Sequence, residues 1–406
     1  MSYVLGVVLF AAALLISIAW HELGHMWAAQ ATGMKVRRYF VGFGPTLWST
    51  QRGETEYGIK AIPLGGFCDI AGMTPHDEMS VADRPRAMYL QATWKRLVVL
   101  FAGPMQNFIL GFVLIIVLAL GWGLPILGDK PVYADSITCV APSTDAKGNP
   151  VECTGPAPAA GAGLRTGDQI LAVDGHTISD RSDLIQHVQR SQGSVQLTVV
   201  RDGAQQELTI PVSRVQRMVL SGDGADAKPV PATVSAIGVG LDQQNVRNYN
   251  ALTVWGGAIT FTGDMFRETF KSLLSLPSKI GDLWHAVTGG KRADDTPVSV
   301  VGASRLGGEA AEHGYWDMFI GLLLSVNLFL GVFNLIPLLP LDGGHMSIAV
   351  YEKLRNTVRR WFGRAAAGPV DYYKLMPLTY AVVVVMGAFM VLTVTADIIN
   401  PIRVFS

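Results

Sequence analysis

The stretch ISIAWHELGHMWAAQ, residues 16–30, places two histidines and a glutamate at the end of a run without charge. Residues 1–20 contain no Asp, Glu, Lys or Arg, and a run of that length can cross a bilayer as a helix. Ionisable side chains in a membrane helix cost a few kcal/mol each, so they are kept mainly for function. The stretch therefore predicts a membrane-spanning helix that carries chemistry at one end.

The composition of the whole chain also indicates a membrane protein. Half of the 406 residues are hydrophobic and 16% are charged, against about 25% in soluble domains. Four charge-poor windows are long enough to span a bilayer: residues 1–20, 97–128, 318–341 and 375–396. A cleaved secretory signal is the alternative for the first window. That window lacks a basic start, however, and a signal leaves the other three windows unexplained.

Lysine and arginine are unevenly distributed between these windows. Residues 26–96 hold nine, and the segment YEKLRNTVRRWFGR, residues 351–364, is densely basic, whereas residues 129–317 hold sixteen over a much greater length. Basic residues collect in cytoplasmic loops. We therefore expect both short segments on the cytoplasmic side of a plasma or inner membrane, with the long segment and both termini outside.

Cysteine usage agrees with this orientation. Cys139 and Cys153 fall in the long segment, where oxidising conditions let disulfides persist, so we predict that they pair. Two unpaired thiols in a surface loop are the alternative. Cys68 falls on the reducing side without an obvious partner, and we expect a structural role for it.

Residues 156–212 of the long segment indicate a small α+β domain. Residues 169–173 predict a strand, Asp174-Gly175 a turn, residues 181–189 an amphipathic helix, and residues 195–212 a hairpin around Asp202-Gly203. This order resembles a PDZ domain, with GAGLRTGD, residues 161–168, at the place of the loop that prepares the peptide groove. The resemblance implies capture of an extended peptide at a sheet edge. A domain that serves only as a cap or sieve is the alternative.

Two further segments connect this domain to the third window. The polar stretch SGDGADAKPVPA, residues 221–232, predicts a linker. Residues 251–288 show apolar side chains at helical spacing among charged ones. Such a helix lies at the membrane surface or packs on the protein, and the sequence leaves both possibilities open.

The motif His21-Glu22-Leu23-Gly24-His25 has the pattern H-E-x-x-H. On a helix the two histidines sit one turn apart on one face and can share a metal ion, with Glu22 beside them to take a proton from water. The alternative is a pair of histidines satisfied by polar neighbours inside a helix bundle. A catalytic zinc ion usually takes three protein ligands and leaves one position open.

The third ligand is expected at the end of the third window, in NLFLGVFNLIPLLPLDGGH, residues 327–345. Asn334, Pro337 and Pro340 break the helix there, and broken helices are tolerated in membranes only where protein or water satisfies the freed backbone groups. Asp342 follows the break, so its carboxylate is the predicted ligand. His345 is a rival ligand, and an aspartate that merely ends a helix at the interface is the other alternative.

Taken together and in order, these pieces resemble the site-2 proteases, which are intramembrane zinc metalloproteases. The resemblance is closest to the bacterial kind with an outer PDZ domain, and in particular to actinobacterial members. It covers nearly the whole chain. The pieces that carry it are HELGH, FVGFGP, YGIKAIPLGGF, FAGPMQNF, the PDZ-like insert and NLIPLLPLDGG.

The resemblance implies roles for individual residues. His21, His25 and Asp342 would hold one Zn²⁺, and Glu22 would be the general base. Residues near the metal would contact substrate, although helix packing is an alternative for each of them; these are Asn107, Asn334 and Pro337.

The fold expected from the resemblance is a polytopic α-helical membrane protein with four transmembrane helices, a membrane-associated β-hairpin and an extracytoplasmic PDZ-like domain. The hairpin is expected from RRYFVGFGPTLWST and TEYGIKAIPLGGF, residues 37–50 and 55–67. Its edge would pair with an unwound substrate strand, or it would only pack on the helices. The expected segments are 1–33 (first span), 34–94 (β segment), 95–128 (second span), 129–220 (PDZ-like domain), 221–315 (linker and amphipathic helices), 316–343 (broken third span), 344–374 (basic cytoplasmic loop) and 375–406 (fourth span and C-terminus).

The expected function is cleavage of single-span membrane proteins, such as trimmed anti-sigma factors, within the bilayer and toward its cytoplasmic side. No nucleic-acid partner is expected. The alternative is a metal-binding transporter or a PDZ scaffold without protease activity. That alternative gives no reason for a carboxylate beside the histidines, and the spans lack a second row of ionisable side chains. A secreted soluble zinc protease fails on the three further windows.

Overall fold

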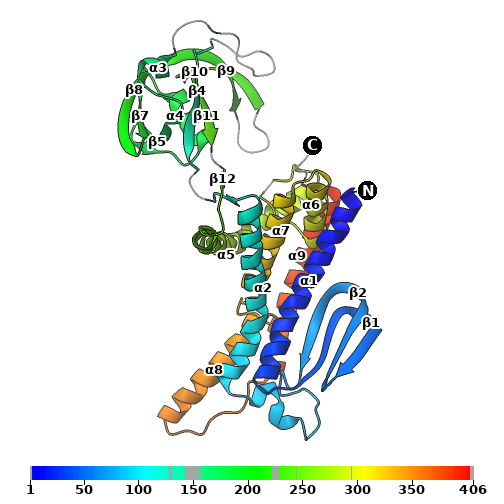
Figure 1. Ribbon diagram of the computed structural model, residues 1–406. Helices are drawn as coiled ribbons and strands as arrows, with labels where there is room; N and C mark the ends of the chain where they lie inside the picture. Colours follow the sequence, from blue (N-terminus) through cyan, green and yellow to red (C-terminus); the bar gives the residue numbers. More distant parts are fainter. Residues whose placement is uncertain are drawn as a thin grey trace. The chain divides into compact units, whose positions relative to one another are not determined.

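The computed structural model describes residues 2–127, 130–141, 153, 157–221, 228–243, 245–293 and 295–402. The chain forms two compact units (Figure 1). The first unit comprises Met1–Trp122 and Asn250–Ser406, and the second comprises Gly123–Tyr249. The second unit is therefore inserted into the sequence of the first.

Four helical segments of the first unit are long and apolar enough to cross a membrane. They are α1 (Ser2–Ala31), α2 (Thr93–Gly121), α7 (Trp316–Asn334) and Tyr372–Ile399, most of which is α9 (Met376–Ile399). Apolar side chains such as Val4, Ile16 and Val384 are more than 60% exposed on these helices, as expected for surfaces that face lipid. Each of the four predicted windows overlaps one of these segments, although residues 122–127 of the second window and 335–341 of the third lie beyond the ends of α2 and α7.

Small and polar residues bring the spanning helices together. A Cβ atom at Gly24 of α1 would lie 2.4 Å from the carbonyl oxygen of Ala102, so only glycine permits this approach of α2. Between α1 and α7 the buried amide of Asn327 donates to Ser17 Oγ over 3.1 Å. Lipid is as apolar as leucine, so helices in a membrane associate through such close packing and hydrogen bonds. Figure 1 shows α1, α2 and α7 side by side.

The predicted hairpin follows α1 as β1 (Val36–Arg52) and β2 (Thr55–Ile70). Both strands are long and bent, so residues 36–41 of β1 pair on one side with residues 66–70 and on the other with residues 56–59. Residues 66–70 pair with no other strand among the described residues and form an edge of this sheet. The hydroxyl of Tyr39 donates to the carbonyl oxygen of Ala19 over 2.7 Å and joins the sheet to α1.

The third span ends where the sequence predicts a break. Helix α7 stops at Asn334, and α8 (Asp342–Trp361) begins after seven intervening residues. The basic segment expected between the third and fourth spans, residues 344–374, is helical over residues 344–361, which form most of α8. One face of this helix is buried and includes Ile348, Ala349 and Glu352. Their helical spacing is visible in the sequence, but the many basic residues around them favour the interpretation as a loop.

Two amphipathic helices return the chain from the second unit to the spans. Helix α5 (Val254–Val287) packs against α2, α7 and α9, while several large apolar side chains on it stay exposed, among them Trp255, Ile259 and Trp284. Helix α6 (Val300–Glu312) packs against α1. The described part of the chain also contains short 3₁₀ segments, among them η1 (Arg84–Arg86), η2 (Met88–Leu90) and η4 (Tyr372–Leu375).

The second unit is an antiparallel sheet with helices α3 (Pro158–Gly161) and α4 (Arg181–Arg190). The strand order is β11-β4-β5-β7-β8, with β6 paired to β5. A core of buried Val, Leu and Ile side chains fills the unit. The strands of this sheet are β4 (Val132–Ile137), β5 (Gln169–Val173), β6 (His176–Thr177), β7 (Ser194–Arg201), β8 (Ala204–Pro211) and β11 (Val239–Gln243).

The Asp-Gly turns predicted in this unit are present. Asp174 and Asp202 adopt φ of 49° and 50°, and the glycines that follow them have φ of 78° and 80°. Positive φ at both central residues is typical of the turns that join tight hairpins, and it explains why Asp-Gly marked both sites in the sequence. The predicted strand over residues 169–173 is β5, and the predicted hairpin is formed by β7 and β8 on the two sides of Asp202-Gly203.

The predicted linker over residues 221–232 is wrong for residues 228–232, which form the first half of β10 (Lys228–Ala236). This strand pairs with β9 (Ser213–Ser221) and with no other strand among the described residues, so its prolines at positions 229 and 231 are compatible with an edge. Residues 222–227 of the expected linker lie outside the described residues. A final pair, β3 (Leu124–Pro125) and β12 (Val246–Arg247), lies at the two ends of the unit.

Candidate metal centre

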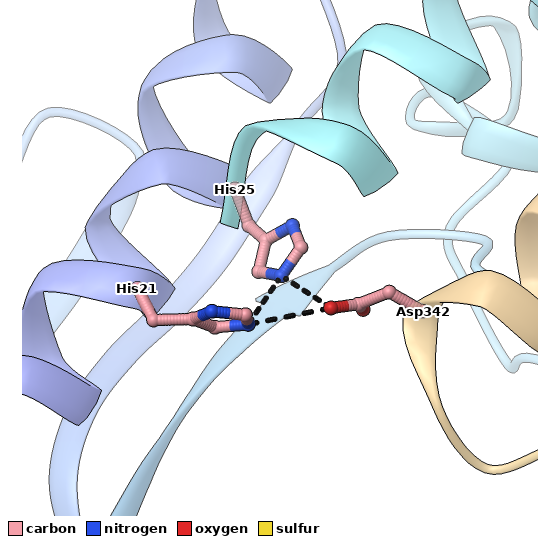
Figure 2. A group of neighbouring side chains, drawn as sticks. All are labelled: His21, His25 and Asp342. Atoms are coloured by element: carbon pink, nitrogen blue, oxygen red, sulfur yellow. Dashed lines mark hydrogen bonds and ion pairs between the residues drawn. The ribbon is translucent and has the colours of Figure 1, made fainter. Parts of the chain in front are cut away.

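Helix α1 positions the two histidines of the H-E-x-x-H motif. His21 and His25 lie one turn apart, and each is only 7% exposed. Their Nε2 atoms are 3.1 Å apart, and Figure 2 shows both rings directed at one point. Two neighbouring imidazole nitrogens facing the same buried space are an arrangement that a shared metal ion explains.

Asp342, more than 300 residues later, completes this group. Its Oδ2 atom lies 3.3 Å from Nε2 of His21 and 3.3 Å from Nε2 of His25 (Figure 2). Asp342 is the first residue of α8, where a negative charge is favoured by the helix dipole. A Cβ at Gly343 would lie 2.3 Å from the carbonyl oxygen of Leu335, so the glycine lets α8 start directly against the break after α7.

The spacing of the three ligand atoms fits a tetrahedral zinc ion. With bonds of about 2.0–2.1 Å, two ligands of such an ion lie about 3.3 Å apart. The three separations in the cluster are 3.1, 3.3 and 3.3 Å. Two nitrogens and one carboxylate oxygen are also donors that zinc accepts, and they leave the fourth position for water.

Helix α2 forms the wall behind this cluster through residues spaced by four. A Cβ at Gly103 would lie 2.2 Å from Nε2 of His25 and 2.7 Å from Nε2 of His21, so any larger residue would fill the metal position. The Nδ1 atom of His25 lies 2.8 Å from the carbonyl oxygen of Val99, and the amide nitrogen of Asn107 lies 3.1 Å from Nδ1 of His21. Residues 99, 103 and 107 share one face of the helix.

Glu22 lies beside the cluster and next to the hairpin. Its side chain is partly exposed, and it is close enough to His21, His25 and Asp342 to interact with them electrostatically. A Cβ at Gly66 of β2 would lie 3.6 Å from Cγ of Glu22, so the edge formed by residues 66–70 passes this carboxylate. Glu22 is therefore placed between the cluster and a free sheet edge.

The hairpin groups near Glu22 stay protonated at neutral pH. Burial, together with the nearby carboxylate of Glu22, raises the pKa of Tyr39 to about 12. Burial also raises the pKa of the Cys68 thiol well above its usual range, and this cysteine forms no disulfide. A neutral phenol and a neutral thiol are poor bases, so Glu22 is the better proton acceptor at this end of the cluster.

The remaining predicted site residues lie at different distances from the cluster. Asn107 is 1% exposed and contacts His21, as described above. Asn334 ends α7, and Pro337 is exposed and lines a cleft of about 670 Å³ with α8 and the segment before α9. The rival ligand His345 directs Nδ1 at the hydroxyl of Tyr372, 3.4 Å away. The structure thus gathers Asp342, and not His345, with the histidine pair.

One contact that braces the site was missed in the sequence. Arg96 of α2 donates to Glu352 of α8 over 2.5 Å, and both side chains are nearly buried. The other carboxylate oxygen of Glu352 accepts from the peptide N–H of Val370 over 2.7 Å. This ion pair joins α8, which carries Asp342, to α2, which carries the wall of the cluster. In the sequence Arg96 is one of nine basic residues in residues 26–96, and no pattern there pairs it with Glu352.

The predicted cysteine pair lies in the second unit. Cys139 and Cys153 form a disulfide with a Cα–Cα distance of 5.9 Å. Oxidised cysteines are typical of compartments outside the cytoplasm.

The geometry supports a metal-dependent hydrolase with a glutamate as base, and comparison with known proteins identifies the family. The model of Peptidase family M50 matches residues 9–378. The chain belongs to peptidase family M50. Zinc metalloprotease Rip1 of Mycobacterium bovis is 51% identical over the full length of both chains, and the Rip1 protein of Mycolicibacterium smegmatis is equally similar. A putative zinc metalloprotease of Nostoc is 30% identical over 85% of each chain.

Membership in the M50 family accounts for the main features of the chain. The protein is a zinc metallopeptidase of the site-2 type, and Zn²⁺ is its cofactor. The four apolar helices make it a membrane protein. The H-E-x-x-H motif that opened the sequence lies inside the matched region, on the first of these helices.

Proposed function

We propose that this M50 peptidase hydrolyses peptide bonds within or near the membrane-spanning segment of single-span proteins. His21, His25 and Asp342 hold the zinc ion in this proposal, and Glu22 is the general base. The observation that carries it is the convergence of three ligand atoms within 3.1–3.3 Å of one another, two from the spanning helix α1 and one from the start of α8, with the carboxylate of Glu22 beside them.

The roles of the protein groups follow from their positions. Bound at this cluster, Zn²⁺ would make a water more acidic and polarise the carbonyl of the scissile bond. Glu22 accepts the proton of the attacking water and then delivers it to the leaving amine. Glu22 is the less buried of these groups, whereas the two histidines are buried and serve as ligands.

We infer that Asn107 positions His21 instead of binding substrate. It is buried, and its amide is in contact with Nδ1 of His21. Coordination through Nε2 leaves the proton of His21 on Nδ1, which needs an acceptor, so the amide of Asn107 turns over and presents its oxygen to Nδ1 in the metal-bound state. In the orientation described, that buried oxygen has no hydrogen-bond partner. Val99 supplies the corresponding carbonyl for His25. Asn334 and Pro337 remain candidates for substrate contacts.

The hairpin offers a place for the substrate backbone. A transmembrane helix hides its peptide carbonyls in internal hydrogen bonds, so it must unwind before cleavage. The unpaired edge at residues 66–70 runs beside Glu22. An unwound segment that adds to this edge replaces its lost hydrogen bonds and brings a carbonyl to the metal.

The second unit is proposed to be a PDZ-like domain outside the cytoplasm. Support comes from its order of strands and helix and from the loop at residues 163–168. Arg201 donates to the buried carboxylate of Asp168 at 2.6 and 2.8 Å and to the carbonyl oxygen of Gly163 at 2.8 Å, which holds that loop in shape. Acting as a filter, such a domain admits substrates whose outer part has been trimmed, as in anti-sigma factors.

The proposed orientation places both termini and the second unit outside. Support comes from the low density of basic residues in residues 129–317, the disulfide of Cys139 with Cys153, and the dense basic segment on α8. The metal cluster, at the start of α8 and near the end of α1, then lies toward the cytoplasmic face.

The test uses the full chain purified in detergent with a single-span substrate trimmed on its outer side. Glu22→Gln is expected to retain one zinc ion per chain and to lower cleavage by roughly 10²–10⁴-fold, because the base is lost and the ligands remain. Metal analysis and cleavage products from gels or mass spectrometry give both readouts. Cleavage at the wild-type rate by Glu22→Gln would remove the proposed mechanism.

A further inference from the structure

A second group of metal-ligating side chains lies in the second unit. His176, Asp183 and His187 each offer a ligand atom, and these atoms lie within 4.8 Å of one another. Among the described residues, this group and the proposed catalytic cluster are the two such sets that contain histidine. The proposed proteolysis gives this second group no role.

The group joins two elements that are separate in the sequence. Asp183 and His187 lie one turn apart on α4, and His176 comes from β6. Nε2 of His176 is 3.4 Å from one carboxylate oxygen of Asp183, and Nδ1 of His187 is 3.0 Å from the other. The two imidazole rings stack with centroids 4.2 Å apart. Both histidines therefore direct a ring nitrogen at the same carboxylate.

The central carboxylate is fixed before any ion arrives. Asp183 accepts from the peptide N–H of Ser179 over 3.0 Å. The hydroxyl of Ser179 also donates to this carboxylate, over 3.4 Å. The peptide N–H of Asp183 is in turn held by the side chain of Asp180, which caps α4. A carboxylate held between two imidazole nitrogens is a ligand set suited to a divalent cation.

The ligand types select the cation. Imidazole nitrogens suit Zn²⁺ and Cu²⁺, whereas Mg²⁺ prefers oxygen ligands and its own waters. The ligand atoms lie within 4.8 Å of one another, against about 3.3 Å expected around zinc, so the side chains move closer by up to about 1.5 Å when an ion binds. The side chains of His176 and His187 are 52% and 36% exposed, which leaves them room to do so.

We propose that His176, Asp183 and His187 form a second, exchangeable zinc site on the second unit. The ion joins β6 to α4 and thereby fixes the helix against the sheet. Because the ligands are exposed and not yet at bonding separations, this site binds zinc more weakly than the buried cluster. The site is independent of the proposed proteolysis, since its ligands lie in another compact unit.

The test counts zinc ions on the full chain without an affinity tag. Chains in detergent are equilibrated with Zn²⁺ at neutral pH, and bound metal is measured by mass spectrometry. We expect two ions per chain for the wild type and one for the double variant His176→Gln/His187→Gln. The matched control is His313→Gln, for which we expect two ions. Nδ1 of His187 lies 3.0 Å from the carbonyl oxygen four residues earlier, and Nδ1 of His313 lies 2.9 Å from the corresponding oxygen.

Variants at Asp342 distinguish zinc bound at the second site from zinc bound at the buried cluster. Asp342→Asn is expected to bind one ion, and adding His176→Gln/His187→Gln to it is expected to remove that ion. Binding of one ion by the wild type and by the double variant would overturn the proposal. A second ion that survives the double substitution, or that Mg²⁺ replaces equally well, would overturn it too.

Discussion

The two histidine–aspartate groups of this protein contain the same side chains and differ in how they are built. In the first unit the three ligand atoms are buried and lie 3.1–3.3 Å apart, with α2 packed behind them. In the second unit the atoms lie within 4.8 Å, and the histidines are one-third to one-half exposed. The difference shows that the surrounding helices, more than the ligand types, decide how rigid a metal site is.

The strongest test of this contrast removes a ligand from the buried cluster. Asp342→Asn is expected to lose the resident zinc and to lower cleavage by roughly 10³-fold or more, because several kcal/mol of transition-state stabilisation go with the metal. Zinc content and product formation are measured on the same preparation.

Asp317→Asn is the matched control, since Asp317 is also an acidic residue in the first turn of a helix, α7. It loses only a favourable interaction with the helix dipole, worth about 0.3–1 kcal/mol, and keeps zinc and activity. Equal losses in both variants would mean that Asp342 serves the helix and not the metal.

The role of Gly103 behind the buried cluster is tested by adding a side chain at that position. Gly103→Ala places a methyl group 2.2 Å from Nε2 of His25, so we expect zinc to be displaced and cleavage to fall by about 100-fold or more. Gly121→Ala on the same helix meets no atom within 4 Å and is expected to behave as the wild type. Full zinc occupancy in Gly103→Ala would show that the ion does not lie between the histidines.

The orienting bonds are tested with Asn107→Ala. Loss of a side chain that fixes a ligating histidine lowers metal affinity by about 10–100-fold. We expect Asn107→Ala to show this loss in a competition with a zinc chelator, while the KM for substrate stays unchanged at saturating zinc. A raised KM with unaltered zinc affinity would instead return Asn107 to the substrate-binding group.

The smallest expected effect concerns the second unit alone. The paired guanidinium of Arg201 lowers the pKa of Asp168, whose side chain is 2% exposed. A lowered pKa in the folded state contributes stability above the unfolded value of about 3.9, and this contribution is lost as the pH falls below that value. Asp168→Asn should therefore reduce stability at neutral pH by about 1–3 kcal/mol.

The measurement is the calorimetric unfolding transition of the second unit. The wild type should lose stability between neutral pH and acid more steeply than Asp168→Asn does. Parallel pH curves for the two chains would contradict this assignment of the ion pair.

The sequence predicted those features that side chains alone encode. The four spans followed from uncharged runs, and the turns at Asp174-Gly175 and Asp202-Gly203 followed from their residue types. The meeting of Asp342 with His21 and His25 was expected from the zinc motif and a resemblance to one family. Each of these features is marked in the sequence by a short local pattern or by a known motif.

Features that depend on backbone atoms or on packing were missed. The carbonyl of Val99 has no sequence signal, although it orients His25. The importance of Gly103 appears only when α2 is placed against α1. The available signal is the spacing of four between Gly103 and Asn107 in FAGPMQNF, which puts both residues on one face of a helix. Strand β10 was missed because its prolines are typical of linkers.

The distance along the chain between the proposed ligands has a consequence for biosynthesis. His21 and His25 leave the ribosome early, whereas Asp342 follows more than 300 residues later. At roughly 5–20 residues per second, about 16–60 s separate the two events. During that interval the growing polypeptide holds an incomplete cluster, so the nascent enzyme is inactive toward neighbouring proteins until its third span has been inserted.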